Sequence, residues 1–466
     1  MVALMDITLA YAIVLGSCLG IMVLLRPVRR FASVICPTSP ELRHLPPLPQ
    51  IIRYLSQWTA KHLTFQAVLR QGKYIDRWSR ADIVLTMMYL GANMTCVLVY
   101  FPGMTQAGFR AGRLSIINTI LLFAGPHLSF VADMLGVSIR TCRRLHVLAG
   151  LVAILLAVFH AIVGAATKGT FSLQTPRNLW ALIAILSFCV QLIPLALRHL
   201  SYEIALRIHQ LLSFVFAYAV WRHIPSVGLF PRLYLYIASG IFLRAVALQL
   251  GLVCYRNKLG LCRARISYDL NTIKVRLHLR RPLKLDAGHL SEYGPTTSIV
   301  LFSGPHGQPW RTDGYENILL IATGFGIAAH LPCLRKLIYD YHTRTVPLRR
   351  IHLVWQIDDL DIGIAAQQLL NKALAEDSLD GDYILRISIY LQSNNTEKVS
   401  FGSRGTVYPG KVPLKDVLTV EVAERYERSK TGILVSTAGS FQDELMALLR
   451  ADAYNNLDMM LMEYQP

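Results

Sequence analysis

Seven apolar runs in the first 255 residues constrain the fold of this chain more than any other feature. Each run is long enough to cross about 30 Å of hydrocarbon as a helix. Only 16% of all residues are charged, against roughly 25% in an ordinary soluble domain. The sequence therefore predicts a multi-pass α-helical bundle in a lipid bilayer. The runs cover residues 7–25, 82–101, 114–135, 145–165, 178–197, 206–224 and 232–254.

Basic residues give this bundle an orientation. The net charge of +18 fits the excess of Lys and Arg in cytoplasmic loops, and the sequence carries no nucleic-acid-binding motif. If the basic segment between the first two runs is cytosolic, the arginines of 140–144 and the basic residues of 256–265 are cytosolic too. We therefore expect the N-terminus outside and the C-terminal half in the cytosol.

Beyond residue 255 the pattern changes from long apolar runs to short strands. Signals for three strands come first, and strands then alternate with helices. Such alternation predicts a parallel sheet with helices on its faces. The first three strands are expected at 264–268, 273–279 and 298–302. The later strands are expected at 318–323, 350–357, 385–391, 432–437 and 457–464, with helices at 326–342 and 441–451.

Four histidines repeat one spacing on two of the apolar runs. His146 and His160 lie fourteen residues apart on the fourth run, as do His209 and His223 on the sixth. Fourteen residues make nearly four helical turns, so each pair shares a helix face and is separated by about 21 Å along the axis. Both runs cross the membrane in the same direction. His146 is therefore expected to face His209, and His160 to face His223.

Two imidazoles that face each other can occupy both axial positions of a haem iron. The doubled spacing therefore predicts two haem b groups, one near each membrane surface, with the four histidines as iron ligands. The alternative is that the histidines simply pack inside the bundle, and the identical spacing on two runs argues against it. Arginines beside the ligands are expected near the haem propionates, namely Arg143, Arg144, Arg207 and Arg222.

A glycine turn follows the first strand of the alternating region. The segment 318–329 combines a buried strand, the turn containing Gly324 and Gly326, and a helix that begins near Ile327. Glycines in such a turn let the backbone approach a pyrophosphate, which the helix N-terminus also favours. This pattern predicts a dinucleotide site.

Several segments together resemble the fungal ferric (metallo)reductase family, which is related to the NADPH oxidases. The resemblance runs from about residue 80 to the C-terminus. It is carried by Leu145-His146 with His160, Tyr202-Glu203 with His209, Trp221-Arg222-His223, Gly304-Pro-His-Gly307, Ala322-Thr-Gly-Phe-Gly-Ile327 and Leu353-Val-Trp-Gln-Ile357.

The resemblance implies a ferredoxin-reductase-like cytosolic part and an electron route. Electrons would pass from cytosolic NADPH through FAD and two haems to a ferric or cupric ion complex outside, with the plasma membrane as the expected location. Gly304, Gly307, Gly324, Gly326 and Ile327 would contact the cofactors. The expected domains are an anchor and basic segment at 1–80, a di-haem bundle at 81–255, a FAD-binding barrel at 256–312 and an NADPH-binding α/β domain at 313–466.

Two departures from the family pattern change the expectation for the flavin. No histidine in the chain is followed by proline, although the family seats its flavin with a His-Pro motif. Three strand signals stand where the barrel of the family needs six. We therefore expect a truncated β-barrel that binds FAD weakly or not at all. Near the nicotinamide, Ser436-Thr-Ala-Gly439 replaces the Cys-Gly-Pro of the family.

Two other functions fit the same features. A superoxide-forming NADPH oxidase would share the haem ligands and differ in its acceptor. A haem-binding membrane protein that NADPH cannot reduce would also carry them, whether its flavin domain has degenerated or the gene sequence lacks a piece.

Overall fold

The structure is a computed structural model, which divides into two compact units that we describe separately. The first unit comprises residues 1–31 and 82–252, and the second comprises residues 32–81 and 253–466. The structure describes residues 6–35, 58–59, 62–63, 66–69, 77–100, 103–125, 128–168, 172–198, 200–225, 230–257, 262–269, 272–278, 296–300, 314–378, 383–392, 404–423, 430–451 and 457–462.

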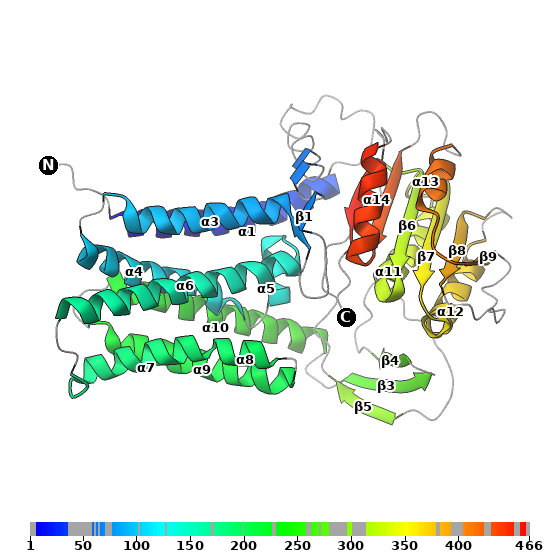
Figure 1. Ribbon diagram of the computed structural model, residues 1–466. Helices are drawn as coiled ribbons and strands as arrows, with labels where there is room; N and C mark the ends of the chain where they lie inside the picture. Colours follow the sequence, from blue (N-terminus) through cyan, green and yellow to red (C-terminus); the bar gives the residue numbers. More distant parts are fainter. Residues whose placement is uncertain are drawn as a thin grey trace. The chain divides into compact units, whose positions relative to one another are not determined.

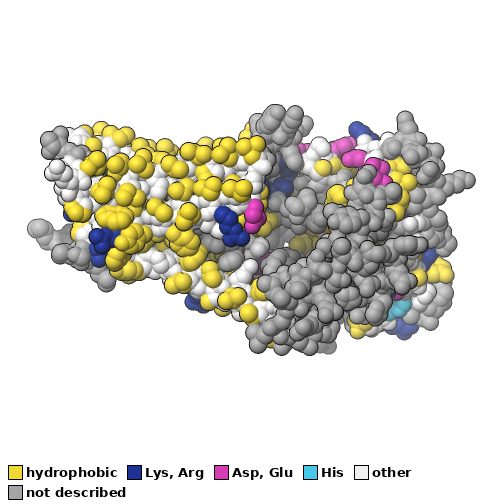
Figure 2. All heavy atoms as spheres, turned by 90° about the horizontal axis from the view of Figure 1, so that it is seen from below, with side chains coloured by type: hydrophobic (Ala, Val, Ile, Leu, Met, Phe, Trp, Pro, Cys, Tyr) yellow, Lys and Arg dark blue, Asp and Glu magenta, His cyan; other side chains and the backbone are white. Residues whose placement is uncertain are grey.

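The first unit is a bundle of long helices (Figure 1). Six described helices are long and apolar enough to cross a membrane, and a bent pair makes a seventh if it counts as one span. Figure 2 shows that apolar side chains cover much of one face of these helices, as expected for a surface in contact with lipid. The helices are α1 (Ile7–Ile35), α3 (Arg80–Leu98), α4 (Met104–Phe123), α5 (Leu128–Leu135), α6 (Ile139–Lys168), α7 (Pro176–Val190), α8 (Leu192–Leu197), α9 (Tyr202–His223) and α10 (Phe230–Arg256).

The third expected span differs from the structure. The apolar run at 114–135, which Pro126, His127 and Asp133 interrupt in the sequence, is divided between two helices. Helix α4 begins ten residues earlier, at Met104, and ends at Phe123, and α5 then continues at an angle of 96° to it. Pro126 follows Gly125 in the sequence, and a proline disfavours helical geometry in the residue before it and cannot donate its own hydrogen bond. The sequence therefore supplies its own break.

A connected polar network joins α1, α3 and α4 inside the bundle. The hydroxyls of Tyr11 and Tyr89 donate to Asn118 Oδ1 at 2.8 and 2.7 Å. Asn118 Nδ2 donates to Asn93 Oδ1 at 2.7 Å, and Asn93 Nδ2 donates to the Tyr11 hydroxyl at 3.0 Å. Both amides are buried. In an apolar surrounding such groups are stable only when they are paired, so the network fixes how these three helices meet.

The second unit contains a six-stranded sheet of order β11-β10-β6-β7-β8-β9, in which every neighbouring pair is parallel. The parallel α/β domain expected from the sequence is therefore confirmed. The strands are β6 (Asn317–Thr323), β7 (Arg350–Ile357), β8 (Leu385–Leu391), β9 (Gly405–Pro409), β10 (Thr431–Ser436) and β11 (Leu457–Leu461). The helices between them are α11 (Ile327–His342), α12 (Leu360–Glu376), α13 (Leu414–Ala423) and α14 (Gly439–Ala451).

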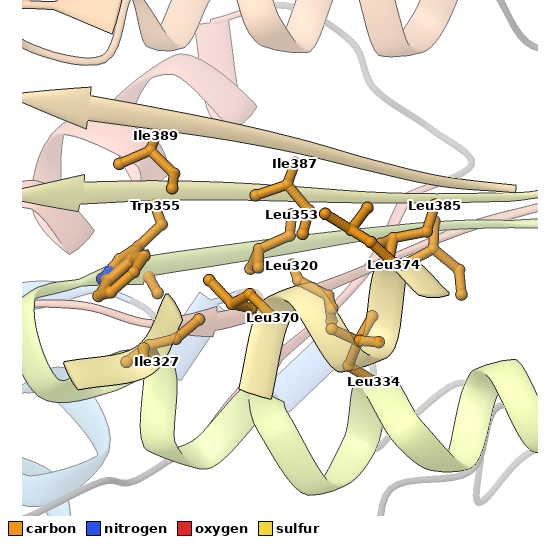
Figure 3. Packing of buried hydrophobic residues seen from close by; sticks show 14 of the residues in the cluster. Leu320, Ile327, Leu334, Leu353, Trp355, Leu370, Leu374, Leu385, Ile387 and Ile389 are labelled. Atoms are coloured by element: carbon orange, nitrogen blue, oxygen red, sulfur yellow. The ribbon is translucent and has the colours of Figure 1, made fainter. Parts of the chain in front are cut away.

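Helices cover both faces of this sheet. Alternate residues of β6 point to opposite faces: Leu320 packs with α11 and α12, and Leu319 packs with α13 and α14. Figure 3 shows the first layer, where Ile327 of α11 lies beside the fully buried Trp355 and Leu370 of α12 lies near Leu320 and Leu353 of the strands. The strands carry apolar residues on both faces because both are covered.

A separate three-stranded antiparallel sheet has the order β4-β3-β5. Its strands β3 (Cys262–Asp269), β4 (Thr272–His278) and β5 (Thr296–Val300) match the three signals expected where the flavin barrel should stand. A short β1 (Ala67–Leu69) pairs with β2 (Trp78–Ser79). Helices α12 and α13 and strand β9 were not predicted from the sequence.

Candidate functional site

Helices α6 and α9 bring two of the four candidate ligands together. The rings of His146 and His209 have centroids 6.3 Å apart, with an interplanar angle of 65°. A metal bound between two imidazole nitrogens at about 2.0 Å separates the ring centres by roughly 6 Å. The spacing of His146 and His209 therefore fits an iron between their rings.

Helix α4 leaves space for the His146 ring. A Cβ added to Gly125, just beyond the end of α4, would lie 2.6 Å from His146 Cε1 and 2.9 Å from its Nδ1. Real Cβ atoms do not approach this closely, so only glycine admits the ring in this position. Within the described residues, the buried Nδ1 of His146 has no hydrogen-bond partner. An orphaned polar atom of this kind fits a ring placed for a bound group and not for packing alone.

His160 lies against α4 in an equivalent way, beside Gly112. A Cβ added to Gly112 would lie 2.8 Å from His160 Nδ1, and the carbonyl of Gly108 accepts a hydrogen bond from that nitrogen at 2.9 Å. A backbone carbonyl that receives Nδ1–H fixes the tautomer and leaves Nε2 with its lone pair, as metal-binding histidines require. The local chemistry of His160 therefore suits a ligand.

His223 is anchored in the same way by another helix. Its Nδ1 donates to the carbonyl of Arg177 at 3.2 Å, and Arg177 Nε donates back to the His223 carbonyl at 3.0 Å. The structure thus joins His146 and His209 by a ring contact, whereas His160 and His223 are each held by a backbone carbonyl. All four side chains fit the role of haem ligand, and that role remains a prediction.

The glycines that make room for these histidines were not predicted from the sequence. Gly112 and Gly125 are thirteen residues apart, close to the fourteen that separate His160 and His146. Because α4 and α6 pack along each other, glycines on one helix come opposite histidines on the other at nearly equal spacing. This matched spacing is the signal that could have indicated them.

Two of the arginines expected near haem propionates have carboxylate partners within the protein. Arg144 forms a 2.6 Å ion pair with Asp82, and Arg207 forms a 3.3 Å pair with Glu203 one turn earlier on α9. Arg222 instead lies over the ring of Trp180, with 5.5 Å from its guanidinium carbon to the ring centroid.

The nucleotide candidates lie where the strand order of the large sheet reverses. Strand β6 has β7 on one side and β10 on the other, so the chain leaves β6 in one direction and later returns in the other. In open α/β sheets, ligands bind beyond the carboxyl ends of the strands at this point. Gly324 has a φ of +50° in the turn after β6, and the buried Ile327 begins α11. The turn and the helix N-terminus thus stand at the expected crevice.

The fold itself requires glycine at position 326, whether or not a nucleotide is bound. A Cβ on Gly326 would overlap the carbonyl oxygen of Ser436 at the end of β10. The same two strand ends are joined where the Ala438 amide donates to Thr323 Oγ1 at 2.7 Å. The segment 436–439, which replaces the Cys-Gly-Pro of the family, therefore lies against the glycine turn. Gly304 and Gly307 lie outside the described residues.

A buried histidine lies beneath this turn. His330 on α11 is fully buried, and its Nε2–H donates to the Ile321 carbonyl at 2.9 Å. Its buried Nδ1 has no partner within the described residues, so a proton there would be unsatisfied. Burial lowers the pKa of His330 to about 4, so the side chain is neutral at physiological pH.

Comparison with known proteins matches both units to one group of enzymes. Residues 111–220 match the family described as the ferric reductase like transmembrane component, and residues 315–437 match the ferric reductase NAD binding domain. The chain thus joins a ferric reductase-like membrane domain to a ferric reductase NAD-binding domain. It is a multi-pass membrane oxidoreductase. The first match contains Gly112, Gly125 and three of the four histidines, and it ends before His223.

Other comparisons give distant similarity. No curated protein matches the chain. Among solved structures, a flavohemoglobin from Malassezia yamatoensis with bound FAD and heme is 12% identical, with a TM-score of 0.32, covering 77% of this chain and 98% of that one. The CS-b5R domains of human Ncb5or in the NAD+ form are 15% identical, with a TM-score of 0.23, covering 43% of this chain and 59% of that one.

Proposed function

We propose that this oxidoreductase transfers electrons from cytosolic NADPH, by way of FAD and two bis-histidine haems, to a ferric or cupric ion complex outside the membrane. The observation that carries the proposal is the His146–His209 ring pair at 6.3 Å within a ferric reductase-like domain. A second candidate pair, His160 and His223, lies fourteen residues further along the same two helices. When bound, haem supplies transfer of one electron at a time without binding oxygen, because both axial positions are filled.

The residues of the chain have separable tasks in this proposal. His146 and His209 hold the inner group, and His160 and His223 hold the outer one. The glycines of α4 keep space for the first ligand of each pair, and backbone carbonyls orient His160 and His223. In the other unit, the glycine turn after β6 and the N-terminus of α11 bind the pyrophosphate of the nucleotide.

The direction of transfer follows from the distribution of basic residues. With the C-terminal half in the cytosol and the plasma membrane as the site, the nucleotide is bound inside and the acceptor is reduced outside. His146 and His209 then lie near the cytosolic face, and His160 and His223 near the outer face.

A flavin is part of the proposal because NADPH gives two electrons as a hydride whereas haem iron takes one. Within the described residues, the segment between the two family matches contributes the three-stranded sheet β4-β3-β5. We therefore expect purified protein to contain FAD well below one equivalent. Stoichiometric FAD after gel filtration would contradict this expectation and would show that the short sheet suffices.

The decisive experiment isolates the haem route from the flavin. Purified protein in sealed vesicles is reduced with dithionite, the excess is removed, and an impermeant ferric chelate is offered on the face opposite the C-terminal half. We expect rapid re-oxidation, and we expect His160→Ala to abolish it while the inner haem is still reduced. Fast oxidation by oxygen with slow oxidation by the chelate would instead favour the superoxide-forming oxidase. Oxidation by neither would leave a haem protein without a reductase function.

A further inference from the structure

Three of the four acidic residues of the helical unit lie at one end of the bundle. Residues 82–255 contain twelve Lys and Arg but only three acidic residues. Asp82 lies in the first turn of α3 and pairs with the start of α6, Glu203 lies in the first turn of α9, and Asp133 lies in α5, which leads directly into α6. All three therefore lie at the end where α6 and α9 begin. The end where α9 finishes has none of them.

Three arginines surround the last turn of α9. Arg222 belongs to that turn, Arg177 Nε donates to the His223 carbonyl at 3.0 Å, and Arg232 donates to the Ile224 carbonyl at 2.9 Å. No carboxylate of the described residues forms an ion pair with these three side chains, and the buried Nε of Arg232 has no hydrogen-bond partner there. Asp6, which precedes this region in sequence, pairs with Arg113. Among the described residues, these three guanidinium groups thus have no carboxylate partner.

Aromatic rings hold two of these charges in place. The Arg222 guanidinium lies 5.5 Å from the centroid of the Trp180 ring, and that of Arg232 lies 5.4 Å from the Trp221 ring. Contact with a ring face orients a guanidinium without neutralising it. Tryptophans also gather at the level where membrane meets water. The positive charges therefore stand beside the outer candidate ligand, His223, at a surface that a soluble acceptor can reach.

Fixed positive charge selects acceptors by their own charge. A cationic cluster raises the local concentration of anions and lowers that of cations, and guanidinium groups bind carboxylates in a forked geometry. A bare ferric or cupric ion is repelled by such a cluster. A ferric ion wrapped in several carboxylates carries net negative charge and is attracted.

We propose that Arg177, Arg222 and Arg232 form a docking site for anionic, carboxylate-rich ferric chelates. The inference rests on the proposed function, because it names the class of acceptor for the same electron route. In the reaction, one electron leaves the reduced protein and converts Fe(III) to Fe(II) within the chelate. No covalent bond is made or broken, and no proton moves.

The test compares two acceptors of opposite charge. Dithionite-reduced protein in vesicles, freed of excess reductant, is mixed with ferric citrate or with the cation hexaammineruthenium(III), and re-oxidation is followed by haem absorbance. Arg177 and Arg222 have exposed side chains, so the double variant Arg177→Gln/Arg222→Gln can be made without opening the core. We expect about a tenfold slower reaction with ferric citrate and an unchanged or faster reaction with the ruthenium cation. Added salt should slow only the first.

Control variants separate charge from structure. Arg177→Lys/Arg222→Lys keeps the charge and should retain most of the rate with ferric citrate. Arg198→Gln removes one exposed charge at the opposite end, just before α9 begins, and should change neither reaction. A binding measurement that needs no turnover uses redox-inert gallium(III) citrate, whose affinity should fall in the glutamine variant and return in the lysine variant.

The outcomes distinguish this inference from the proposed function. Equal slowing with both acceptors, or unchanged rates with both, would overturn the docking site while the reductase function stands. Wild-type protein that passes electrons to neither acceptor would overturn the proposed function and the docking site with it.

Discussion

Glycine serves the two units of the molecule in different ways. In the helical unit, Gly112 and Gly125 make room for histidine side chains, which can rotate if they are pushed. In the nucleotide unit, Gly326 makes room for the carbonyl of Ser436, which is tied into a parallel sheet and cannot move away. The difference teaches that the first kind of glycine sets the position of a candidate ligand, whereas the second kind sets the fold itself.

The largest effect should come from removing the side chains for which the helical glycines make room. His146→Ala or His209→Ala should eliminate one of two haems, because a single remaining imidazole cannot fill both axial positions. Haem content per chain by alkaline pyridine assay measures this loss. In the His146→Ala background, Gly125→Ala should have no further effect. Full haem content in His146→Ala, His160→Ala, His209→Ala and His223→Ala alike would refute the ligand assignment.

The next largest effect should come from a side chain at Gly326, where it would crowd the Ser436 carbonyl. Gly326→Ala should destabilise the nucleotide unit by about 3 kcal/mol or more, since overpacking against an immobile group lies at the upper end of its usual range. Gly324→Ala is the matched control: no atom lies within 4 Å of its added Cβ, and the left-handed φ of +50° costs about 1 kcal/mol. Thermal unfolding of the full-length protein in detergent compares the two. Equal costs would mean that the Ser436 contact relaxes easily.

Acidification should affect the stability of the two units differently. His330 stays neutral in the folded protein because its pKa is about 4, whereas the unfolded chain takes up a proton below about 6.5. The free energy of unfolding of the nucleotide unit is therefore highest above pH 6.5 and falls as the pH drops towards 4, by up to about 3 kcal/mol. Urea titrations of intact protein between pH 7.5 and about 4.5 test this.

The control for this titration is His330→Gln, which keeps a donor and removes the ionisable ring. Its pH dependence should be flatter than that of the wild type while haem absorbance in the other unit serves as an internal reference. An identical slope in both proteins would assign the effect to other groups.

The smallest effect is expected at the glycines that face histidine side chains, because those side chains can rotate. Gly125→Ala and Gly112→Ala should each tilt one histidine, shifting the midpoint potential or the low-spin spectrum of one haem without loss of the helical fold. Gly91→Ala is the control, since no atom lies within 4 Å of its added Cβ. If Gly91→Ala changes the spectrum as much as Gly125→Ala, the space left for the ring is not what matters.

The sequence predicts those features that repeat at regular intervals. The spacing of His146 and His160 matches a helical period, and the strands from Ile318 onward are continuous apolar runs, so bundle and parallel sheet could both be predicted. Helix α12 was missed because half of its buried positions are the small residues Gly363, Ala366 and Ala373, which weaken the apolar pattern. The glycines that make room for a neighbouring group were missed for another reason. The need for Gly125 or Gly326 depends on a neighbour far away in sequence, and no local pattern records that neighbour.

The polar network of α1, α3 and α4 bears on how the bundle is assembled during synthesis. These helices leave the ribosome before either histidine helix. The amide of Asn93 can use the Tyr89 carbonyl of its own helix, 2.9 Å away, and the Tyr11 hydroxyl before Asn118 is made. Once Asn118 arrives, the three helices close around one another. We therefore expect α1, α3 and α4 to assemble before α6 and α9 are inserted. Gly112 and Gly125 would then already be in position, and cofactor insertion would be a late event in biogenesis.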